Sequence, residues 1–250
     1  MGSRISDGAA ADDRLGPAAH RLFQAQGLAV AIALTLAAPA LAAEEAGGCP
    51  AGAARVELVL EDPPPVLSAA GRIVPPEGGA AAPPGARLHH LGLTTSRVAW
   101  GSEMETRWRE GEGGICARPA RVTLRLAQTE HRIRIAREIP EGGCLWRAVE
   151  AHERRHVAVN RATLRHAAAE ARQAAEAWAG RAEGRGPTME AAVAALQEGL
   201  RQAIEPALAG MRKAREAAHA AIDTPEEYAR LGRICPEDRA RLRARLGRPG

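Results

Sequence analysis

The sequence has few aromatic residues and almost no lysine. Its 250 residues include one Phe, one Tyr and four Trp, and Lys213 is the single lysine among 34 basic residues. Proteins that bind single-stranded nucleic acid stack bases on aromatic side chains along a basic groove. Here the arginines alternate with acidic residues and the net charge is only +4. The composition therefore argues against nucleic-acid binding and predicts an aliphatic core.

Long hydrophobic runs are also scarce, since one stretch from Leu28 to Leu41 is the main example. Arg14 and Arg21 precede it, and it closes in an A-x-A type site before Ala43, which is typical of a secretory signal. We therefore expect residues 1–42 to be a signal peptide and the mature protein to be periplasmic or secreted. A retained N-terminal anchor is the alternative. No later segment is as apolar, so we expect no stable membrane span after cleavage.

The four cysteines contain no C-x-x-C pair of the kind found in metal knuckles and redox centres. An even number of cysteines in an oxidising compartment predicts two disulfides, for which three pairings exist. Cys116 and Cys144 bracket a strand-like segment, and Cys49 and Cys235 lie near the two ends of the mature chain. We therefore predict the pairs Cys116–Cys144 and Cys49–Cys235.

Proline clusters divide the remaining chain. Residues 43–85 form a proline-rich lead-in with one predicted strand at 54–60, where apolar residues alternate with others. The main domain is expected at 86–235, followed by a helical tail at 236–250.

Within the main domain, two alternating stretches at 121–126 and 131–137 flank Gln128-Thr129. They predict an antiparallel hairpin with one face toward the core. The core-facing residues would be Val122, Leu124, Leu126, Ile133 and Ile135.

No Gly or Pro interrupts the chain from Cys144 to Gly180, which predicts one long helix. A second long helix should follow the break at 180–187, because apolar residues recur at steps of three and four from Met189 to Met211. Thr224-Pro225 is a typical start for a last short helix. The fold class is therefore α+β. A small antiparallel sheet would pack on the first long helix, which would form an antiparallel helical hairpin with the second.

The first long helix carries an H-E-x-x-H motif at His152, Glu153 and His156. Residues at i and i+4 lie one turn apart on the same face, so the two imidazoles can share one ion. Glu153 lies about 100° further round and can reach a water on that ion. Zinc lowers the pKa of such a water toward about 7, and the glutamate can take its proton as the water attacks a carbonyl. The motif predicts a zinc hydrolase.

A catalytic zinc usually has three protein ligands, so a third must be found. His166 is excluded because it lies about 15 Å further along the same helix. Folding the helical hairpin about residues 183 and 184 places 211–215 opposite 156–152, so the ligand should come from the returning helix or the residues after it. His219 and Glu227 are the leading candidates, and Glu216, Asp223 and Glu226 remain open.

From about Leu91 to Leu164 the chain resembles a bacterial family of unknown function described as predicted secreted zinc-dependent proteases. The shared features are Thr94-Thr95 leading to Trp100, then Cys116, Pro140, Trp146 and the His152–His156 motif. The resemblance implies a zincin-like metalloprotease domain with α+β fold, His152 and His156 as zinc ligands, and Glu153 as general base. Where the family has an aromatic-Asp pair followed by Thr and His, this chain has Ile222-Asp223-Thr224-Pro225-Glu226-Glu227 and lacks the aromatic residue and the histidine.

The leading hypothesis is a periplasmic or secreted zinc metallopeptidase that hydrolyses a peptide or protein substrate. An amidase acting on cell-wall peptides would use the same site. The alternative is a non-catalytic envelope protein whose helical hairpin binds a partner, with a structural or vestigial metal site.

Overall fold

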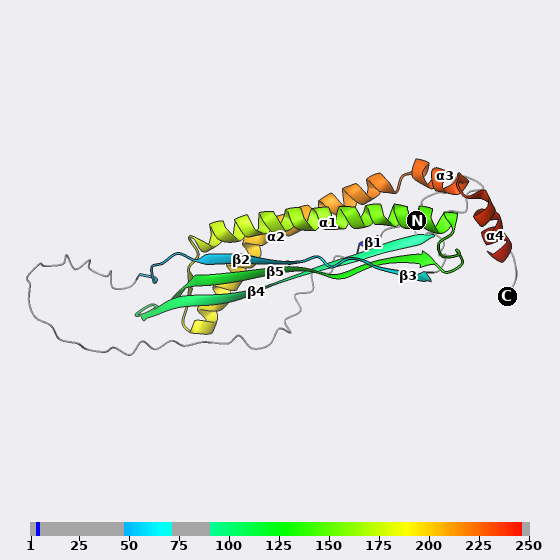
Figure 1. Ribbon diagram of the computed structural model, residues 1–250. Helices are drawn as coiled ribbons and strands as arrows, with labels where there is room; N and C mark the ends of the chain where they lie inside the picture. The colour runs from blue at the N-terminus through cyan, green and yellow to red at the C-terminus, as the bar shows by residue number, and fades with distance from the viewer. Residues whose placement is uncertain (1–3, 6–47, 72–90, 247–250) are drawn as a thin grey trace, which may run out of the picture.

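The computed structural model describes residues 4–5, 48–71 and 91–246, so most of the predicted signal peptide lies outside the described residues. The described chain is α+β, as predicted, with helices covering one face of an elongated sheet (Figure 1). The strands are β1 (Arg4–Ile5), β2 (Arg55–Glu61), β3 (Val66–Gly71), β4 (Gly92–Gly111), β5 (Gly114–Ala136) and β6 (Gly184–Gly186). The helices are α1 (Cys144–Ala179), α2 (Met189–Ile222), α3 (Pro225–Arg233) and α4 (Pro236–Leu246).

The sheet is mixed, so the predicted antiparallel pairing holds for β4 and β6 with β5 and is wrong for the other strands. β4 and β5 form a long antiparallel hairpin, whereas β2 and β3 pair in parallel with β5 along its other edge. β1 lies parallel to β4, and β6 is antiparallel to β5. The predicted strand at 54–60 is confirmed as β2, and β3 follows it in the same proline-rich lead-in.

The predicted turn at Gln128-Thr129 is also wrong, because residues 114–136 form the single strand β5. Val98 pairs with Gln128 and Arg97 pairs with Glu130, so Thr129 is one extra residue in the ladder. This β-bulge shifts the alternation by one residue without reversing the chain. The five residues predicted to face the core, from Val122 to Ile135, are all fully buried.

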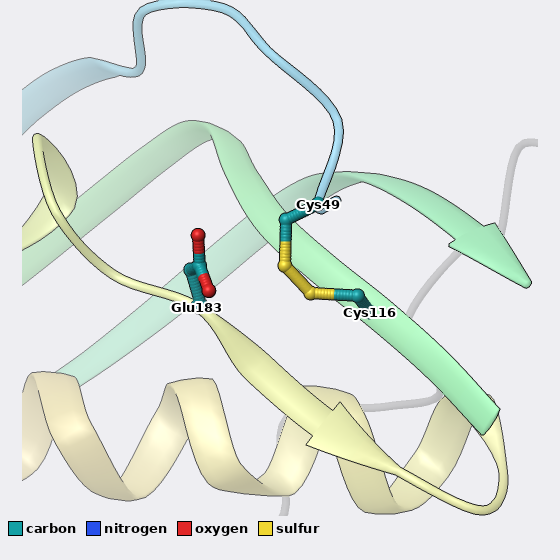
Figure 2. A group of neighbouring side chains, drawn as sticks. All are labelled: Cys49, Cys116 and Glu183. Atoms are coloured by element: carbon teal, nitrogen blue, oxygen red, sulfur yellow. A yellow bond between two sulfur atoms is a disulfide. The ribbon is translucent and has the colours of Figure 1, made fainter. Parts of the chain in front are cut away.

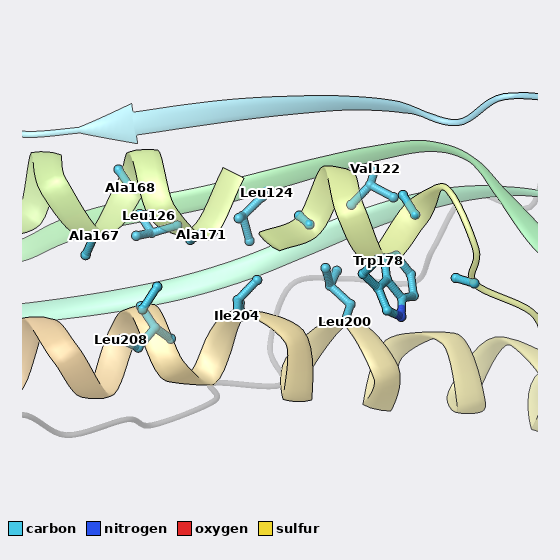
Figure 3. Packing of buried hydrophobic residues seen from close by; sticks show 14 of the residues in the cluster. Val122, Leu124, Leu126, Ala167, Ala168, Ala171, Trp178, Leu200, Ile204 and Leu208 are labelled. Carbon is cyan, nitrogen blue, oxygen red and sulfur yellow. The ribbon is translucent and has the colours of Figure 1, made fainter. Parts of the chain in front are cut away.

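The predicted helical hairpin is confirmed. α1 presents an alanine-rich face to α2 and β5, and small side chains let the layers approach closely (Figure 3). The cluster includes Ala167, Ala168, Ala171 and Ala175 of α1, Leu200, Ile204 and Leu208 of α2, and Val122, Leu124 and Leu126 of β5.

The register of this hairpin differs from the predicted one by about two turns. His219, rather than Met211, lies opposite His156, and Arg215 lies opposite Asn160. The difference arises because the connection contains β6, which pairs with β5 at Ile115–Ala117, so α2 begins only after its N-cap Thr188. The end of α2 is therefore brought to the H-E-x-x-H motif.

The disulfides join Cys49 to Cys116 and Cys144 to Cys235, so the predicted pairing is wrong. The prediction assumed that the chain between Cys116 and Cys144 folds back on itself. Instead β5 continues as one strand to Ala136, at about 3.3 Å per residue, and carries the chain away from Cys116 before Cys144 is reached. Cys49 reaches Cys116 because β2 runs alongside β5, as Figure 2 shows with Glu183 nearby.

The C-terminal helices are fastened to the first turn of α1. Gly143, the N-cap of α1, has no side chain to accept a hydrogen bond, and Asp238 of α4 replaces it by accepting from the Leu145 N–H at 2.9 Å. Leu242 is buried, and the Cys144–Cys235 disulfide closes the same contact. α4, which forms the predicted helical tail, thus packs against the start of α1 and helps to hold α3 there.

We predict that Asp238→Ala lowers the free energy of unfolding by about 1 kcal/mol, the usual effect of losing a helix N-cap. The neighbouring Glu237→Ala is the matched control, since Glu237 is exposed and its nearest ion-pair contact is a loose one, with Arg241 at 3.7 Å. Urea unfolding of the oxidised protein measures both. Equal effects of the two substitutions would contradict a capping role for Asp238.

Candidate metal centre

The H-E-x-x-H motif lies in a band of buried polar residues between two apolar clusters. One cluster surrounds the alanine-rich part of α1, and the other lies between the start of α1 and the end of β5. Thr94, Ser96, Gln128, His131, His152, Glu153, His156, Asn160, Arg215 and His219 are the buried polar residues of this band. Buried polar atoms need partners, so their arrangement carries chemical information.

Three acceptor-type atoms converge on one point beside α1. Asp223 Oδ1 lies 3.1 Å from His152 Nε2 and 3.2 Å from His156 Nε2, and the two nitrogens are 3.2 Å apart. Ligands of a tetrahedral zinc with bonds of about 2.0–2.1 Å are separated by about 3.3 Å, so this triad has the spacing of a zinc donor set. The histidine side chains are buried, and that of Asp223 is 16% exposed. Their geometry fits one divalent cation.

Asp223 reaches the motif because α2 ends there. Its backbone N–H donates to the carbonyl of His219, and the next residue, Thr224, caps α3 by accepting from the Glu227 N–H. Burial opposes ionisation of Asp223, but its close contacts with His152 and His156 outweigh burial and lower the pKa of its carboxyl. Tyr228 also hydrogen-bonds Asp223. The third donor is therefore an ionised carboxylate, as a cation requires.

His219 supports His156 from behind. His156 Nδ1 lies 2.7 Å from His219 Nδ1, and His219 Nε2 lies 3.0 Å from Asn160 Oδ1. Burial is the largest cause that lowers the pKa of His219 to about 4, and the nearby charge of Arg215 adds to it, so its ring is neutral near pH 7. Because an amide oxygen only accepts, His219 donates from Nε2 and accepts at Nδ1. His156 Nδ1 is then the donor, and the lone pair of His156 Nε2 faces Asp223.

Glu227 occupies the corresponding position behind His152, with Oε1 3.2 Å from His152 Nδ1. Hydrogen bonding from Arg230 is the largest cause that lowers the pKa of Glu227 to about 2, and the charge of Arg155 adds to it against burial. A carboxylate that accepts from the outer nitrogen of a ligand histidine orients its ring and raises its basicity. The sequence makes His219 and Glu227 the leading candidates for the third ligand. They contact the Nδ1 atoms of the two histidines, which face away from the triad, and Asp223 is the residue that contacts both Nε2 atoms.

Glu153 lies directly beside the triad with one carboxylate oxygen anchored. Thr94 Oγ1 donates to Glu153 Oε2 at 2.8 Å, whereas Oε1 is buried and no donor in the described part of the chain reaches it. Burial raises the pKa of Glu153, although the Thr94 hydrogen bond and the two histidines oppose that rise. β4 passes so close that a Cβ on Gly92 would come within 2.6 Å of Glu153 Oε1. Thr94 and Gly92 are site residues that sequence reasoning did not assign a role.

Three other features do not form a comparable site. Cys49, Cys116 and Glu183 lie together (Figure 2), but the two sulfurs are joined in a disulfide and offer no thiolate. His166 is exposed and pairs with Glu170, in agreement with its exclusion from the ligand set. A cavity of about 230 Å³ lined by His166 and Met211 lies between α1 and α2, without any residue of the triad.

Comparison of the chain with family models, with curated proteins and with solved structures finds no match in any of the three. Within residues 48–71 and 91–246, no helix has the length and apolar content needed to cross a bilayer. The assignment of the site therefore rests on the geometry of its residues.

A zinc ion held by the triad would lose a direct ligand in Asp223→Ala, so we expect its affinity to fall by more than about 100-fold, whereas loss of a residue that only hydrogen-bonds a ligand typically costs about 10–100-fold. Glu226→Ala is the matched control, since Glu226 is an exposed acid three residues away. Competition with a chromophoric chelator measures the affinities. Unchanged zinc affinity in Asp223→Ala would show that the triad is not the binding site.

Proposed function

We propose that the protein is an exported zinc metallopeptidase, with zinc held by His152, His156 and Asp223 and with Glu153 as general base. The observation that carries this proposal is the convergence of two imidazole nitrogens and a carboxylate oxygen beside Glu153, whose Oε1 meets no hydrogen-bond donor among the described residues. Two imidazoles and one carboxylate with an open fourth position are typical of catalytic zinc, whereas structural zinc sites are usually closed by four protein ligands.

Bound zinc would polarise a peptide carbonyl and make a water molecule acidic enough to react near neutral pH. Glu153 would accept the proton from that water at Oε1 and later deliver it to the leaving amine. Thr94 would hold the other oxygen in place, so the carboxylate would not rotate away from the reacting atoms. Burial would keep Glu153 more basic than an exposed glutamate, which suits a general base.

An extended substrate could align along the outer edge of β4. Thr95 and Ser96 of β4 pair there with Arg4 and Ile5 of β1, so this edge can accept an added strand. The preceding residue, Thr94, is the one that contacts Glu153, so a strand on this edge would pass close to the general base. Backbone pairing of this kind suits peptide bonds in a protein or in a cell-wall peptide.

Three features support an exported enzyme. The chain has a signal-like N-terminus, two disulfides that suit an oxidising compartment, and a resemblance to predicted secreted zinc-dependent proteases. A non-catalytic envelope scaffold with a structural metal would use the same three donors. It would have no need of a buried carboxylate with a free oxygen beside them, and for that reason we favour hydrolysis.

The test is Glu153→Gln, which keeps the shape of the side chain and removes its basicity. We expect zinc content to be retained and cleavage of a peptide library to fall by about 10²- to 10⁴-fold, the usual contribution of a general base. Glu150→Gln, one turn earlier on α1 and paired with Arg154, is the control and should cleave normally. Cleavage that survives Glu153→Gln would refute the proposed role. A wild-type protein that binds zinc and cleaves nothing would favour the scaffold.

A further inference from the structure

We propose that the two histidine ligands are held in opposite tautomers before metal binds. His219 and Asn160 fix His156 in the tautomer that can bind a metal, whereas Arg155 holds His152 in the other one. Arg155 is therefore a positioning residue that acts against the metal ion. The inference rests on the metal site of the proposed function and does not depend on peptide hydrolysis.

The hydrogen bonds that link His156, His219 and Asn160 can run in one direction only. Asn160 is held in place because Arg215 donates to its backbone carbonyl at 2.7 Å, and both residues are buried. Its amide oxygen takes the Nε2 proton of His219, and His219 Nδ1 takes the Nδ1 proton of His156. Both nitrogens of His219 are then in use, so the lone pair of His156 Nε2 already points into the triad.

His152 Nδ1, the ring nitrogen that faces away from the triad, contacts one hydrogen-bond donor and one acceptor. Arg155 Nη2 is 2.8 Å from His152 Nδ1, and Glu227 Oε1 is 3.2 Å from the same atom. Arginine can only donate, so its contact requires a bare Nδ1 and leaves the ring proton on Nε2. That proton has an acceptor in place, because Asp223 Oδ1 lies 3.1 Å from Nε2.

Metal binding reverses this arrangement. A cation on His152 Nε2 requires the ring proton to sit on Nδ1, where Glu227 can accept it and Arg155 cannot. Arg155 also contacts Glu227 Oε1, so it keeps a partner in both states. Metal binding therefore replaces the Arg155 contact with a bare Nδ1 by a hydrogen bond from Nδ1 to Glu227, and both partners are already in place.

The chain offers a matched pair of arginines to test this. Arg155 and Arg230 both bind Glu227 and are both about half exposed, but only Arg155 is in contact with His152. Loss of either positive charge should favour a cation, but only the loss of Arg155 also removes the contact with His152 Nδ1. We expect Arg155→Leu to tighten zinc binding about three- to tenfold more than Arg230→Leu does, the usual effect of one hydrogen bond. Equal affinities in the two variants would overturn the role of Arg155.

Nitrogen-15 NMR of the imidazole rings in the full chain gives a direct readout. Without metal we expect the His152 proton on Nε2 and the His156 proton on Nδ1, and with zinc both protons on Nδ1. A metal-free His152 with its proton on Nδ1, or with both nitrogens protonated, would overturn the inference, as would a zinc-bound spectrum without the exchange. A protein that shows the exchange but cleaves no peptide would overturn the proposed function alone.

Discussion

The structure depends on a largely buried site where two imidazole nitrogens and one carboxylate oxygen lie close together. His152 Nε2, His156 Nε2 and Asp223 Oδ1 lie within 3.2 Å of one another, in a region where an unpaired polar atom costs free energy. A proton on His152 can satisfy one of these contacts, and a divalent cation can satisfy all three. In the buried polar band, His219 contacts His156 and is itself bound by Asn160, and Thr94 anchors Glu153 beside these atoms.

The two apolar clusters on either side of the band have different tasks. The cluster around the alanine-rich part of α1 sets how α2 lies along α1, and so decides which residue of α2 faces His156. The second cluster, with the Cys144–Cys235 disulfide and the Asp238 cap, holds α3 against the start of α1. Asp223 lies between these two supports and depends on both.

Much of this could be predicted from local sequence patterns. The ends of α1, the cap at Thr224, the buried side chains of β5 and the close approach of His152 and His156 follow from spacing, because they depend on residues close in the chain. The disulfide pairing and the position of Asp223 could not be predicted in this way, because they depend on how strands and helices far apart in the sequence align with one another. A bulge at Thr129 takes the place of the predicted turn, and one short strand, β6, delays the start of α2.

That register is also what makes the site sensitive to packing far from it. Trp178 of α1 lies against Gly199 of α2, and a Cβ on Gly199 would come within 2.7 Å of the indole nitrogen. This contact lies near the joint between the helices, whereas Asp223 lies at the other end of α2. A helix rises about 1.5 Å per residue, so a slip of one turn at the Trp178 contact would carry Asp223 about 5.4 Å along α1. The alanine-rich packing therefore determines whether the third donor reaches the two histidines, although none of its residues touches them.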